Sequence, residues 1–192
     1  MINIKSIFLL VFILFSSADA YKLTEDKRVG VDVNPFYLFI VLPSDDGEKV
    51  ASGTILYFDH INYAEFAFPI HYMSLRGSDY KQYAVDFHYR KYVNDHIGGF
   101  YISGFARLIH LNGKSNSVHI DGFNYIKQTK LGLGVGVGVK VFLKNGIYWG
   151  AGVSVGRYLT SENEIFFKDS FFITDDTPFI LDVEFFKFGY AF

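Results

Sequence analysis

Apolar and non-apolar residues alternate over long stretches of this sequence. From Leu131 to Val141, every second residue is Leu or Val. The positions between them are small or charged: Gly132, Gly134, Gly136, Gly138 and Lys140. Successive side chains of a β-strand point to opposite faces, so a period of two predicts a strand with one apolar face. This pattern constrains the fold more than any other feature of the chain.

Eight segments read as strands, and their connections alternate between short and long. Connections 59–62, 94–97 and 144–146 are tight, whereas those around 114–124 and 160–177 are the longest. Membrane β-barrels have short turns at one end and longer loops at the other. The sequence therefore predicts an all-β, up-and-down antiparallel transmembrane β-barrel of eight strands. The expected strands are 28–43, 49–58, 63–74, 81–93, 98–111, 129–143, 147–159 and 178–192.

The parity of the sixth and seventh segments, meaning which residues share a face, determines the length of the turn between them. Both segments keep their apolar residues on one face only if Leu143 pairs with Ile147, which places Val141 opposite Trp149. A shift by one residue would exchange the two faces. The pairing leaves a three-residue turn that ends in Gly146, and such turns commonly need Gly at a left-handed position.

Alternation does not by itself say whether the apolar face points inward or outward. A soluble ligand-carrying barrel buries this face, whereas a membrane barrel presents it to lipid. Glycines and charged residues fill the other face at mid-strand, which suits a narrow lumen better than a solvated surface. The apolar face is therefore expected to point outward, with outer-membrane lipid as its partner and side chains closing the lumen.

The last segment alternates Phe188, Tyr190 and Phe192 at the end of the sequence. It resembles the C-terminal signal of bacterial outer-membrane β-barrels, which the barrel assembly machinery recognises. The resemblance implies a Gram-negative outer-membrane protein that meets this machinery during biogenesis. The same parity places Asp182 and Glu184 outward, where charge facing lipid is unfavourable, unless a β-bulge intervenes.

The N-terminus has the pattern of a secretory signal peptide. Lys5 precedes the apolar run from Ile7 to Phe15, and Ala18 and Ala20 form a small-x-small cleavage motif. The apolar run is too short to span a bilayer as a helix, which needs about 20 residues. The sequence therefore predicts a cleaved signal peptide over 1–20 and a barrel domain over 21–192.

Composition excludes several classes of function. The net charge is −2, with no long basic run, so no nucleic-acid partner is expected. The chain has no Cys, which excludes disulfides and Cys-based metal sites. Its six His residues show no metal-ligand spacing along the sequence, so neither a metal nor a cofactor is predicted.

Charged residues on the inward face are candidates for a lumen network. Counting residues back from the predicted turns places Glu65 opposite Arg90 and Asp86 diagonal to Arg107. Such a network either packs a narrow interior or forms an ion path, and the first is expected because buried charges must be paired. The candidates are Asp32, Glu65, Asp86, His88, Arg90, Arg107 and Lys140.

The sequence contains two further candidate sites, a catalytic cluster and a loop surface. His88 and Ser103, with Asp86 nearby, could form a lipase-like cluster across neighbouring strands, although the chain has no Gly-x-Ser-x-Gly motif. The last long connection mixes acidic and aromatic residues and is either a strand extension or a recognition surface for an unknown external partner. Its residues are Glu162, Glu164, Phe166, Phe167, Asp169, Phe171 and Phe172.

Three functions follow from these observations. The first is a non-enzymatic outer-membrane barrel with a structural or loop-mediated adhesion role. The second is an outer-membrane enzyme that modifies lipids, and the third is a soluble secreted or periplasmic carrier barrel.

Overall fold

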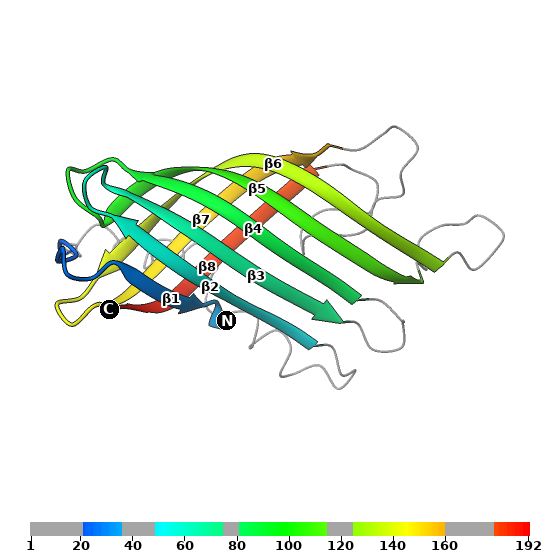
Figure 1. Ribbon diagram of the computed structural model, residues 1–192, viewed down its shortest axis with the longest axis horizontal. Coiled ribbons are helices and arrows are strands. Elements are labelled where there is room, and N and C mark those ends of the chain that lie inside the picture. The colour runs from blue at the N-terminus through cyan, green and yellow to red at the C-terminus, as the bar shows by residue number, and fades with distance from the viewer. Residues whose placement is uncertain (1–20, 36–48, 75–80, 115–124, 160–178) are drawn as a thin grey trace, which may run out of the picture.

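A computed structural model describes residues 21–35, 49–74, 81–114, 125–159 and 179–192. Eight strands pair in sequence order as antiparallel neighbours and close into one barrel (Figure 1). Within the described residues no helix is long and apolar enough to cross a membrane. The strands are β1 (Val29–Val33), β2 (Lys49–Asp59), β3 (Ala64–Ser74), β4 (Lys81–Tyr92), β5 (Gly99–Lys114), β6 (Tyr125–Phe142), β7 (Ile147–Tyr158) and β8 (Phe179–Ala191).

The predicted all-β, up-and-down antiparallel barrel of eight strands is confirmed. Strands β5 and β6 extend three to four residues beyond the expected segments at the ends joined by their common connection. The first strand is expected to run to Pro43, but β1 ends at Val33, and residues 36–48 lie outside the described part.

Pairing between β1 and β8 closes the barrel. Gly30 lies opposite Ala191, and the pairing continues to Val33 opposite Phe188. The backbone of Phe192 adds to this seam: its N–H donates to the Val29 carbonyl at 2.9 Å, and its carbonyl accepts from the Arg28 and Val29 N–H groups. The last residue therefore takes part in barrel closure through its main chain.

Three tight turns lie at one end of the barrel, together with the C-terminus (Figure 1). In the β6–β7 turn, the Leu143 N–H donates to the Ile147 carbonyl at 2.7 Å, and Val141 lies opposite Trp149. Gly146 has a φ of 92°, a left-handed conformation that an L side chain rarely adopts. The register and the Gly position predicted from parity are both present.

The two faces of the barrel wall have opposite chemistry. On β4, Tyr83, Val85, Phe87 and Tyr89 are exposed on the outside, and every residue between them is buried inside. The outward face of β6 is formed by Leu131, Leu133, Val135 and Val137, all exposed. The barrel is therefore apolar outside and charged inside, the reverse of an ordinary soluble protein.

A β-bulge in β8 overturns one expectation from parity. Gly150 pairs with Lys187, but Gly152 pairs with Glu184, so β8 carries one extra residue at this point. Phe186 has a φ of 55°, as a bulged residue can. The bulge reverses the facing of the preceding residues, and Asp182 and Glu184 are buried inside the barrel rather than exposed to lipid.

Glycines on β6 and β7 make room for large side chains of the neighbouring strand β5. A Cβ atom at Gly134 would overlap the Phe105 ring and the Val155 carbonyl oxygen, and one at Gly138 would overlap the Tyr101 ring. The space beside the glycine-lined wall is thus occupied by aromatic rings.

Candidate functional site: the charge network inside the barrel

The inward side chains form layers along the barrel axis, and β4 crosses all of them. From the tight-turn end its buried residues are Tyr92, Arg90, His88, Asp86, Ala84 and Gln82. Tyr92 belongs to one apolar cluster and Ala84 to a second, and the charged or polar Arg90, His88 and Asp86 lie between them. Only strict alternation on a long strand places these groups on one line.

Apolar clusters close both ends of the charged region. At the tight-turn end, Leu23 from the segment before β1 lies against the barrel, and its N–H donates to the Ile97 carbonyl. The rings of Phe58, Phe142 and Tyr148 pack edge to face or tilted against one another there. The second cluster contains Ala84, Phe105, Ile109, Leu111, Tyr158 and Ile180.

Glu65 is the centre of the first group of charges. Its Oε1 accepts from Arg90 Nη1 at 2.7 Å, as the predicted pairing of these strands requires. Its Oε2 accepts from Lys140 Nζ at 2.6 Å and from the Tyr92 hydroxyl at 2.7 Å. Glu65 is fully buried, so these three donors from β4 and β6 replace the water that a carboxylate otherwise needs.

The bulge in β8 brings a second carboxylate to the same group. Glu184 accepts from Arg90 Nη2 at 3.2 Å and forms an ion pair with Lys187 at 2.5 Å. Lys187 Nζ also lies 4.0 Å from Asp32, which accepts a hydrogen bond from the Tyr148 hydroxyl. Sequence reasoning placed Glu184 on the outside because no pattern in β8 marks the bulge.

Arg107 organises the second group of charges. Asp86 lies directly opposite Arg107 across β4 and β5, not diagonally as expected from the turn length. Arg107 donates from Nε to Asp86 Oδ1 at 2.8 Å and from Nη2 to Asp86 Oδ2 at 2.7 Å. Its Nη2 also donates to Asp182 Oδ2 at 2.7 Å. This geometry links three strands through a single guanidinium group.

The buried charges balance. Among the described residues, five buried carboxylates face five buried Lys or Arg side chains, without counting His. A closed, neutral network of this kind packs a narrow lumen, since isolated charge in such a place is unfavourable. All lumen residues named from the sequence are buried, and the carboxylates are Asp32, Glu65, Asp86, Asp182 and Glu184.

His88 and Ser103 do not form the hydrogen bond of a catalytic pair. His88 lies opposite Phe105, and Ser103 lies opposite Arg90. The His88 ring stacks on Phe105 with centroids 5.1 Å apart, and neither ring nitrogen has a hydrogen-bond partner. The nucleophile and base required by the lipase-like hypothesis are therefore not in contact.

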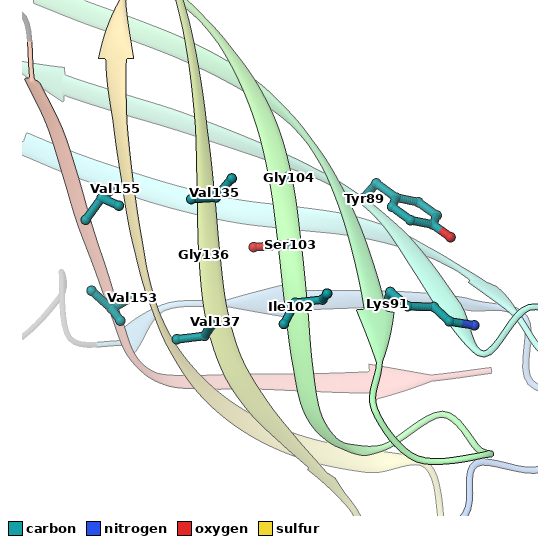
Figure 2. A pocket seen from close by; sticks show the side chains of 10 residues that line it. All are labelled: Tyr89, Lys91, Ile102, Ser103, Gly104, Val135, Gly136, Val137, Val153 and Val155. Carbon is teal, nitrogen blue, oxygen red and sulfur yellow. The ribbon is translucent and has the colours of Figure 1, made fainter.

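A shallow hollow of about 540 Å³ marks the outer surface over β4 to β7 (Figure 2). It lies beside Gly104, where a Cβ atom would meet nothing. Val135, Val137, Val153 and Val155 surround it, as Figure 2 shows. The lining is almost wholly apolar, with Lys91 and Tyr89 at its β4 side.

The other residues singled out from the sequence lie apart from the lumen. Phe188, Tyr190 and Phe192 are exposed on the outside of β8, and the last two rings stack. The acidic and aromatic residues of the last connection fall within 160–178, outside the described residues, as does the predicted signal peptide over 1–20.

The geometry defines a closed, eight-stranded, up-and-down β-barrel with an apolar exterior and a charged, packed interior. No protein-family model, curated protein or solved structure matches this chain.

Proposed function

We propose that this chain is a non-enzymatic outer-membrane β-barrel protein with a plugged lumen, whose role is structural or mediated by its external loops. One observation carries the proposal: the barrel is apolar outside and charged inside. Ile55, Ile70, Val85, Ile102 and Val135 on five neighbouring strands are each at least half exposed. Soluble monomers rarely expose continuous apolar surface of this extent, whereas a lipid bilayer requires it.

The polarity also argues against a soluble carrier. Such a barrel would keep apolar residues inside to hold its ligand and polar residues outside. Here the inside contains paired charges and aromatic rings, and the hollow found over β4 to β7 opens outward. The remaining elements of the proposal are export by a cleaved signal peptide and recognition of the terminal aromatics by the assembly machinery.

Fractionation of Gram-negative cells that express the chain tests the proposal. We expect the protein in the outer-membrane fraction, with faster gel migration before boiling than after, because a closed barrel resists detergent. A soluble periplasmic maltose-binding protein and a known porin serve as fractionation controls. Recovery in the soluble periplasmic fraction, without a heat-dependent gel shift, would overturn the proposal and favour a carrier barrel.

A further inference from the structure

One imidazole and two carboxylates converge inside the lumen, and a second imidazole lies beside one of the carboxylates. His71 comes from β3, Asp86 from β4 and Asp182 from β8, and their ligand atoms all lie within 4.8 Å of one another. His88 lies two residues from Asp86 on the same inward face of β4, and its Nε2 is close to Asp86 Oδ2. We propose that His71, Asp86 and Asp182 form a binding site for a divalent transition-metal ion such as Zn²⁺, with the His88 imidazole beside it.

The distances fit coordination better than hydrogen bonding. His71 Nε2 lies 3.6 Å and His88 Nε2 lies 3.5 Å from Asp86 Oδ2. Hydrogen bonds between N and O measure about 2.7–3.2 Å, so neither imidazole is hydrogen-bonded to the carboxylate. In a tetrahedral Zn²⁺ site with bonds of about 2.1 Å, neighbouring ligand atoms lie about 3.4 Å apart.

The missing hydrogen bonds of His88 point independently to a ligand. Its side chain is 2% exposed, and both ring nitrogens lack a hydrogen-bond partner. Buried polar atoms are nearly always paired, so an unpaired imidazole aimed at a carboxylate needs an explanation. The stacked Phe105 ring holds the imidazole in this orientation. A cation bound to Asp86 would explain an imidazole without hydrogen bonds at this place.

His71 has the supporting contact typical of a metal ligand. Its Nδ1 lies 2.9 Å from the Ser52 hydroxyl on β2, while its Nε2 has no partner. Metal-binding imidazoles commonly hydrogen-bond through the other ring nitrogen, which fixes the tautomer and the ring orientation. With the Nδ1–H donated to Ser52, the free Nε2 lone pair faces Asp86.

Charge and access are also suitable. Arg107 already binds both carboxylates, which leaves the group at one net negative charge with neutral imidazoles. Each carboxylate oxygen has two lone pairs, so Asp86 Oδ2 can accept from Arg107 and still bind a cation. The side chains of His71 and Asp182 are 18% and 11% exposed, so this group is the part of the network in contact with solvent. Imidazole and carboxylate ligands together suit Zn²⁺ and its neighbours rather than Ca²⁺ or Mg²⁺.

Sequence spacing predicted no metal site because the ligands come from three strands. The register of β3 against β4 and the bulge in β8 bring them together. The inference does not depend on the role of the external loops.

Calorimetric titration of the folded, chelator-treated protein in detergent with Zn²⁺ tests the site. We expect one strong site in the wild-type chain, at least tenfold weaker binding in His71→Gln, a smaller loss in His88→Gln, and about tenfold weaker binding in Ser52→Ala. His110→Gln is the matched control, because His110 contacts Thr129 and lies outside the cluster. The control should bind as the wild type does.

Co²⁺ gives a second readout, since a four-coordinate site produces strong visible absorption that His71→Gln should abolish. The gel shift on boiling verifies folding of each variant. If His88→Gln does not fold, His71→Gln decides the question because its side chain is partly exposed. Absence of strong Zn²⁺ binding in the wild type, or equal binding by His71→Gln, would overturn the proposal.

Discussion

Replacement of Arg107 by Ala removes the guanidinium group that links β4, β5 and β8. Asp86 and Asp182 then remain inside the barrel without their principal cation. Asp86 is 1% exposed, so water cannot readily replace the lost donors. We expect a large loss of stability and no comparable change in transport, because the role assigned to Arg107 is to neutralise buried charge.

The magnitude follows from the contacts. Arg107 makes three charge-assisted hydrogen bonds of 2.7 to 2.8 Å to the two carboxylates. Removing one partner of a buried ion pair costs about 3–5 kcal/mol, since the other charge is left uncompensated. This corresponds to a change of about two to three and a half orders of magnitude in the unfolding equilibrium.

Equilibrium unfolding in urea, with the protein folded into lipid vesicles and the single Trp149 as fluorophore, measures this loss. A chelator keeps metal binding out of the comparison. Arg157→Ala is the matched control, because Arg157 is exposed on β7 and its removal should change stability by less than about 0.5 kcal/mol. A loss below 1 kcal/mol for Arg107→Ala would refute the assignment of Arg107 as a structural cation.

Three other predictions test the packing and assembly of the barrel. Gly134→Ala should destabilise the folded barrel by about 1–3 kcal/mol in the same unfolding assay, because its Cβ would overlap the Phe105 ring and a backbone oxygen, whereas Gly104→Ala should be neutral. Equal effects of the two changes would contradict the packed glycine wall. Deletion of Phe192 should reduce insertion into outer membranes while export continues, as measured by fractionation at low expression; wild-type yield would contradict this. Planar bilayer recordings should lack stable, porin-sized conductance steps, because side chains fill the lumen, and such steps would contradict a plugged barrel.

The fold could be predicted because each strand carries its own evidence. The alternation on β4 and β6 assigns a face to every residue, and the short turns fix how neighbours pair. The Leu143–Ile147 pairing and the Glu65–Arg90 contact both follow from this local arithmetic. Hairpin contacts are therefore predictable as far as the turn lengths are known.

Contacts beyond neighbouring strands were not predictable in the same way. The bulge near Phe186 leaves no mark in the alternation, so Asp182 and Glu184 were assigned to the wrong face. Arg107 meets Asp182 across the lumen, between strands far apart in the sequence. Such contacts depend on closure of the barrel and on its stagger, which no single segment encodes.

Photolabelling of isolated outer membranes from expressing cells tests the orientation of the barrel wall most directly. A lipophilic carbene reagent dissolved in the bilayer reacts with side chains that contact lipid, and mass spectrometry locates the modified residues. We expect labels on outward residues such as Ile102, Val135 and Val137 and none on the buried Tyr101 and Phe105. Labelling of the buried set, or no labelling of the outward set, would contradict an apolar exterior facing lipid.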